Sequence, residues 1–100
     1  MNENQYWKWM AEYVEHQIAT NPFKQIPAFE PRKKASEAWG FRMENWIAVA
    51  EWQTKHQARI NRIINRVAKR HGLRLDRKSR SYARLIPIAA NKGISGGDNI

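Results

Sequence analysis

Residues 39 to 71 repeat a spacing of alternating four and three residues, and this repeat limits the possible folds more than any other part of the chain. The ten positions at this spacing carry Trp, Met, Trp, Ala, Gln, Gln, Ile, Ile, Val and His, in that order. Such a spacing places side chains along one face of an α-helix. With Pro31 suited to a first helical turn and Gly72 to a helix end, it predicts helical structure over residues 31–71.

The predicted seam is apolar at both ends but polar at Gln53 and Gln57. Buried amides without partners are costly. Three explanations remain open: the helix is broken there, the seam faces solvent there, or two copies pair and the glutamines bond across a dimer interface. We favour a long helix that is bent or broken near residues 53–56, because the charge of the chain also changes there.

The charge differs sharply between the two halves of the chain. Residues 1–54 carry seven acidic and six basic side chains, whereas residues 55–100 carry twelve Lys or Arg and two Asp. One domain over residues 1–91 is therefore predicted to have a near-neutral aromatic part, 1–54, and a basic part, 55–91. Residues 92–100 hold three glycines and are predicted to form a disordered tail.

An N-terminal helix is predicted over residues 4–20. Its apolar stripe includes Trp7, Met10, Val14 and Ile18, Asn2 or Asn4 can cap its start, and the residue before Pro22 ends it.

The next segment, residues 22–31, holds three of the four prolines. Phe23, Ile26 and Phe29 recur there at every third residue, which predicts an extended strap with these side chains on one edge. Near the other end of the chain, Ser79 or Ser81 can cap a short helix that Pro87 ends. The predicted fold class is all-α: an N-terminal helix, the strap, a long helix or helix pair, and a short basic C-terminal helix.

The positive charge of the predicted long helix lies on one arc beside its apolar seam. At about 100° per residue, the arc spans roughly 180° to 280° from Ile60. No Asp or Glu occurs from residue 55 to 75, although a solvated helix face usually mixes both signs. The predicted binding residues are those of this arc and of the segment after it: Lys55, Arg59, Arg62, Arg66, Lys69, Arg70, Arg74, Arg77, Lys78, Arg80 and Arg84.

A row of arginines neutralises phosphates, so the sequence predicts a small accessory protein that binds DNA, RNA or a nucleoprotein complex with little sequence specificity. A helix-turn-helix around Gly72 is not favoured, because its second helix would bury Lys78 and Ser81. The alternative function is that of a phage-type protein that inhibits or modulates a host DNA-processing enzyme, such as a nuclease–helicase, or docks on an acidic protein surface.

Other functional classes find little support in the sequence. Without cysteine, and with three scattered histidines, we expect no metal site, no cofactor and no enzymatic activity. Trp9 and Trp52 lie off the apolar stripes and are predicted to form a possible protein-partner surface, which a homodimer could also use. The chain has no apolar run of membrane-spanning length and no signal-peptide pattern at its start, which predicts a cytoplasmic protein.

Two short motifs suggest a family. The segment Asn21-Pro22-Phe23 followed by Ala38-Trp39-Gly40 resembles the order of motifs in ribosome modulation factor and its small phage-borne relatives. The resemblance covers residues 18–47, with a longer gap between its two parts and without the preceding glycine-containing turn. It implies a ribosome or another structured RNA as the partner.

Overall fold

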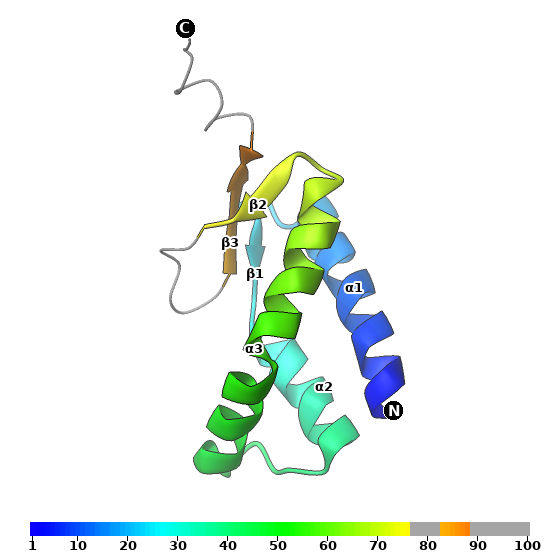
Figure 1. Ribbon diagram of the computed structural model, residues 1–100, viewed down its shortest axis with the longest axis vertical. Coiled ribbons are helices and arrows are strands. Elements are labelled where there is room, and N and C mark those ends of the chain that lie inside the picture. The colour runs from blue at the N-terminus through cyan, green and yellow to red at the C-terminus, as the bar shows by residue number, and fades with distance from the viewer. Residues whose placement is uncertain (77–82, 89–100) are drawn as a thin grey trace, which may run out of the picture.

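The structure is a computed structural model that describes residues 1–76 and 83–88. Within these residues, three helices pack with a small antiparallel sheet (Figure 1). The helices are α1 (Glu3–Thr20), α2 (Phe29–Trp39) and α3 (Trp46–Lys69), and the strands are β1 (Gln25–Ile26), β2 (Leu73–Leu75) and β3 (Ala83–Pro87). The predicted all-α class is therefore wrong, because the described part of the chain is mixed.

The N-terminal helix forms as its sequence predicts. Asn2 is the cap: its Oδ1 accepts from the backbone N of Gln5, and the Gln5 Oε1 accepts from the backbone N of Asn2, both at 2.8 Å. This reciprocal pair satisfies two of the free N–H groups at the helix start. The predicted stripe of α1 is buried, and the helix ends before Pro22.

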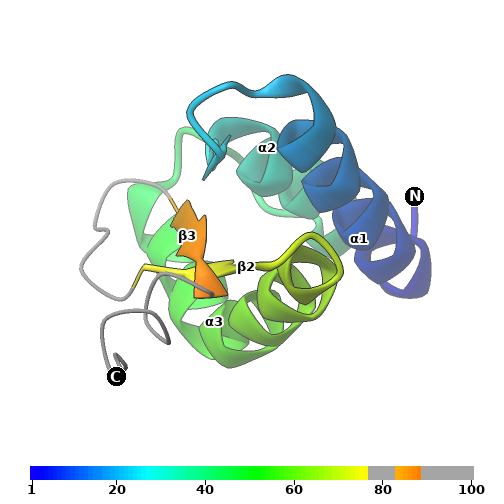
Figure 2. The same ribbon diagram turned by 90° about the horizontal axis from the view of Figure 1, so that it is seen from above.

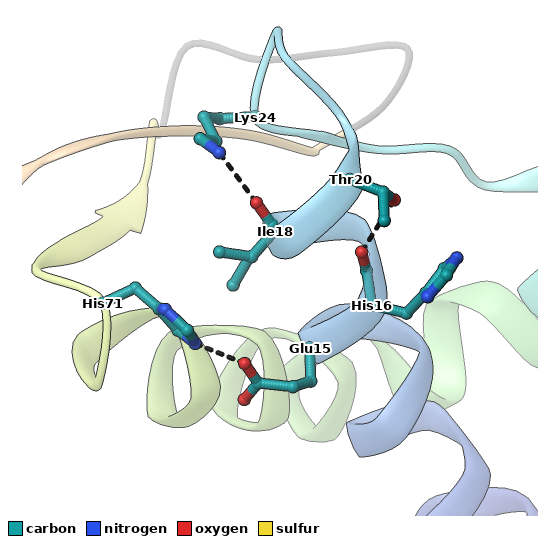
Figure 3. A network of polar contacts seen from close by, with 6 residues as sticks. All are labelled: Glu15, His16, Ile18, Thr20, Lys24 and His71. Carbon is teal, nitrogen blue, oxygen red and sulfur yellow. Dashed lines mark hydrogen bonds and ion pairs between the residues drawn. The ribbon is translucent and has the colours of Figure 1, made fainter.

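Side chains also satisfy carbonyl groups in the last turn of α1 (Figure 3). The Thr20 hydroxyl donates to the carbonyl oxygen of His16 at 2.8 Å, and the Lys24 Nζ donates to that of Ile18 at 2.7 Å. These bonds hold the turn that leads into β1, and the bond from Lys24 supplies a partner to the Ile18 carbonyl, one of the last carbonyls of α1, which lack partners within the helix itself.

The break in the predicted long helix lies at residues 40–45, not at 53–56. Gly40 ends α2 with a left-handed φ of 77°, which glycine adopts without strain. Asn45 then caps α3, because its Oδ1 accepts from the backbone N of Ala48 at 3.1 Å. From Trp46 to Lys69 the helix is continuous through both glutamines.

The proline-rich segment does not form a strap with one apolar edge. Ile26 is buried in β1, whereas Phe23 and Phe29 are largely exposed. The segment divides into a turn, a two-residue strand and the first turn of α2, where Pro31 is buried. Each part has its own geometry, so a three-residue period cannot persist.

A strand, β3, occupies residues 83–87, where the C-terminal part of a helix was predicted. It is the central strand and pairs antiparallel with both neighbours: Gln25 lies opposite Arg84, and Leu75 opposite Leu85. The buried Leu85 lies between the exposed Arg84 and the half-buried Ile86, as expected where successive side chains of a strand point to opposite faces. Ser79 and Ser81, the predicted caps, lie outside the described residues, as do residues 92–100 of the predicted tail.

The core has an aromatic part and an aliphatic part. Tyr6 and Trp7 of α1 meet Trp39 of α2 and Trp52 of α3, mostly edge to face, with ring centroids 5.0–5.7 Å apart. Farther along, aliphatic side chains of α1 and α3 pack together with Ile26 and Leu85 of the sheet. Figures 1 and 2 show the sheet beside the C-terminal half of α3, on the flank away from α1.

Candidate functional site

Six exposed basic side chains follow one another along α3 and its C-terminal cap, and we call them the basic face. The opposite side of the helix is buried through Ile60, Ile64 and Val67, which fixes the orientation of the helix. Because the helical period is 3.6 residues, the basic side chains are left on the solvent side. They are Lys55, Arg59, Arg62, Arg66, Lys69 and Arg70.

The basic face lacks acidic partners among the residues that the structure describes. Over residues 1–76 and 83–88 the ion pairs are Arg42 with Glu44, at 3.4 Å, and His71 with Glu15. The second pair joins the end of α3 to α1, and its donor is a histidine just beyond the basic face (Figure 3). The six charges therefore remain available to an anion from outside.

A shallow hollow of about 390 Å³ borders the basic face between α1 and α3. The Arg59 guanidinium lies over the Trp7 ring, 4.3 Å from its centroid, which fixes the arginine by a cation–π contact. Arg66 from α3 and Lys8 from α1 line the same hollow, together with one acidic residue, Glu12. The hollow thus brings in Lys8, a basic residue that helical spacing within α3 alone could not identify.

The other predicted binding residues do not all extend this face. Arg74 is half-buried in β2 and donates to the carbonyl oxygen of Leu75 at 3.2 Å, whereas Arg84 is exposed on β3. Both belong to the sheet, which lies on the flank of α3 away from α1 (Figure 2). The remaining three, Arg77, Lys78 and Arg80, lie outside the described residues.

The two tryptophans predicted to form a partner surface differ in how far they are buried. Trp52 is only 5% exposed and is part of the aromatic core, so its assignment to a surface is wrong. Trp9 is half-buried and stacks on Tyr13 with centroids 5.0 Å apart. The prominent exposed ring is instead Trp46, which is 79% exposed at the start of α3 next to the exposed Ile47.

Two titratable side chains outside the basic face, those of His56 and Tyr6, make contacts with residues of the core. His56 lies among the rings of Trp7, Trp39 and Trp52. Burial raises the pKa of Tyr6 well above its usual value, and its hydroxyl donates to the carbonyl oxygen of Pro31 at 3.1 Å. These contacts join the core elements, whereas the acidic residues that line hollows are Glu12, beside the basic face, and Asp76, on the other flank of α3.

Among residues 1–76 and 83–88, no three His, Asp or Glu side chains lie close enough together to hold a metal ion. None of the helices described is both long enough and apolar enough to cross a bilayer.

No protein-family model, no curated protein and no solved structure matches this chain. The two motifs that resemble ribosome modulation factor lie at the ends of two helices. Asn21-Pro22-Phe23 forms the turn after α1, and Trp39-Gly40 ends α2. The function therefore has to be argued from the basic face itself.

Proposed function

We propose that this protein binds nucleic acid through the basic face of α3, by contacts to the phosphate backbone and with little sequence specificity. The observation that carries the proposal is the row of six exposed basic side chains without an acidic partner in the described residues. A polyanion gains from such a row because it releases bound counterions on contact.

The length of the row suits a duplex or a folded RNA. From Lys55 to Arg70 the helix rises about 22 Å at 1.5 Å per residue. This length corresponds to roughly six base pairs at 3.4 Å each. The arginines can bind phosphates with two donors each, and Arg59 is already held in place by Trp7.

The element after α3 favours backbone binding over base reading. In a helix-turn-helix, a second helix comes after the turn and enters the major groove. Here Gly72, with a φ of 72°, leads instead into β2. The basic face also runs along one helix, α3, which packs on α1. A nucleic-acid backbone that lies against α3 can therefore contact this face.

The test compares two double variants that each remove two exposed positive charges. Arg62→Gln with Arg66→Gln alters the basic face and avoids Arg59, which packs on Trp7. Lys33→Gln with Arg42→Gln is the control, because both residues are exposed and belong to or follow α2.

Mobility-shift titrations with short double-stranded DNA and with a structured RNA measure affinity at several salt concentrations. For DNA, the basic-face variant should flatten the slope of log affinity against log salt by about 1.8, from 0.9 per phosphate contact. The control pair should have a smaller effect. Equal losses in both pairs would show a general charge effect and contradict the proposal. Absence of binding to either nucleic acid at moderate salt would overturn it and favour an acidic surface on a nucleic-acid-processing enzyme. Preferential binding of the RNA would agree with the family resemblance.

A further inference from the structure

A second hollow, of about 650 Å³, lies on the other flank of α3. This volume falls within the range of roughly 300–1,000 Å³ that is usual for ligand pockets. One wall is a row of four carboxamide side chains on α3, namely Gln53, Gln57, Asn61 and Asn65. The opposite wall comes from residues 26–28, the start of α2 and the end of β2. We call this hollow the carboxamide groove.

The four amides are spaced by four residues, and the first three are linked along the helix. The Gln53 Nε2 donates to the Oε1 of Gln57, whose Nε2 donates to the Oδ1 of Asn61 at 2.8 Å. The Oδ1 of Asn65 accepts from the backbone N of Leu75 at 2.9 Å, which fixes β2 to the helix. Each amide has two donors and two acceptor lone pairs, so this wall keeps unused hydrogen-bonding capacity.

Further unused donors belong to two other side chains of the groove. The Trp52 Nε1 and the Arg32 Nε are buried and have no acceptor in the part of the chain that the structure describes. Both side chains line the groove, and Trp52 is only 5% exposed. A buried donor without an acceptor is unfavourable. Trp52 belongs to α3 and Arg32 to α2, so a ligand rich in carbonyl oxygens suits both sides of the groove.

The spacing of the amides selects the class of ligand. Residues four apart in a helix rise about 6.0 Å. Alternate residues of an extended peptide repeat every 6.4–6.8 Å or so, and their N–H and C=O groups face the same edge. A row of side-chain amides at nearly this repeat can therefore pair with the backbone groups of alternate residues on one edge of the peptide. The row spans about 18 Å from Gln53 to Asn65, the length of five or six extended residues.

We infer that the carboxamide groove binds an extended peptide segment of five or six residues through its backbone. The peptide does not extend the sheet, because the edge of β1 is already occupied. The Asn21 Nδ2 donates to the carbonyl oxygen of Gln25 at 3.1 Å, and the Tyr13 hydroxyl donates to that of Pro27 at 2.8 Å. Pro27 also has no N–H to offer. This inference does not depend on the proposed binding of nucleic acid.

The test uses N-acetylated, C-amidated hexapeptides of randomised sequence, added as pools to the full chain labelled with nitrogen-15. Side-chain NH₂ resonances report directly on the row, and those of Gln53, Gln57 and Asn61 should shift. Hexapeptides N-methylated at alternate residues are the matched probe, since methylation removes the donors of one edge and leaves the side chains. Methylation at either alternation leaves the other edge intact, whereas methylation at every residue removes the donors of both edges and should abolish the shifts.

Two variants complete the experiment. Gln57→Leu should weaken binding of the hexapeptide pools by about three- to tenfold, the range expected for one lost hydrogen bond. Arg62→Gln with Arg66→Gln should leave peptide affinity unchanged, which separates a failure of this inference from a failure of the proposed function. The inference is overturned if the pools shift none of the three amides, if hexapeptides methylated at every residue shift them as strongly as the unmethylated pools, or if a DNA or RNA oligonucleotide shifts these amides in place of the peptides.

Discussion

Replacing Trp52 with alanine tests the packing of the core most directly. The Trp52 ring is 5% exposed. It lies 5.6 Å from the ring of Tyr6, 5.4 Å from Trp39, 6.2 Å from Phe41 and 5.1 Å from His56. Truncation of a buried aromatic of this size costs about 3–5 kcal/mol. The total stability of a small domain is about 5–15 kcal/mol, so the variant should lose a large share of it.

Trp46→Ala is the matched control, because it removes the same ring from the same helix at a position that is 79% exposed. Its cost should stay within about 0.5 kcal/mol. Urea denaturation followed by far-ultraviolet circular dichroism measures both variants without relying on tryptophan emission. In thermal melts, Trp52→Ala should lower the midpoint by about 12 °C or more, from 4–8 °C per kcal/mol at this size. Equal losses in the two variants, or a larger loss for Trp46→Ala, would refute the packing described for α3.

Two further changes test individual hydrogen bonds. Asn45→Ala removes the cap of α3 and should cost about 1 kcal/mol in urea denaturation, whereas Asn4→Ala, at an exposed position inside α1, should cost clearly less; equal costs would contradict the capping role. Tyr6→Phe removes the bond to Pro31 and should cost about 1 kcal/mol at neutral pH. Because the pKa of Tyr6 is raised in the folded protein, its neutral form stabilises the fold, and this contribution is lost as the pH rises above about 10. Stability should therefore fall less steeply above that pH in Tyr6→Phe than in the parent, and parallel curves would exclude this role.

Local signals predicted α1 correctly. Its capping residue, its apolar stripe and the stop before Pro22 all lie within the segment itself, so no distant contact is needed to determine them. The exposed arginines of α3 were predicted for the same reason, since their common arc follows from the helical period alone.

The register at the start of α3 was missed, because the four-and-three spacing continues across the loop at residues 40–45. That coincidence put Trp46 on the seam. The buried series actually begins with Val49, Trp52 and half-buried His56, which also have helical spacing. Gly40 and Asn45 are the sequence signals that mark the break.

The sheet and the carboxamide groove depend on residues far apart in the chain. β3 is a strand because it finds partners at residues 25–26 and 73–75, and no local pattern in five residues can show this. Gln53 and Gln57 stood out in the sequence as polar seam positions. Their surroundings could not be deduced, because the opposite wall is built by β1, α2 and β2. Of the three explanations for these glutamines, the structure supports a polar seam that faces an open groove.

The central place of β3 has a consequence for folding during translation. Ile26 of β1 is synthesised well before Leu85 of β3, and β1 has no strand partner until β3 has been synthesised. At synthesis rates of roughly 5–20 residues per second, β1 waits about 3–12 s for β3. The residues of all three helices are already made by then, so α1, α2 and α3 can pack first through their own apolar faces. Pairing with β3 can then complete the sheet, and until β3 is made the edge of β1 that faces it has no strand partner.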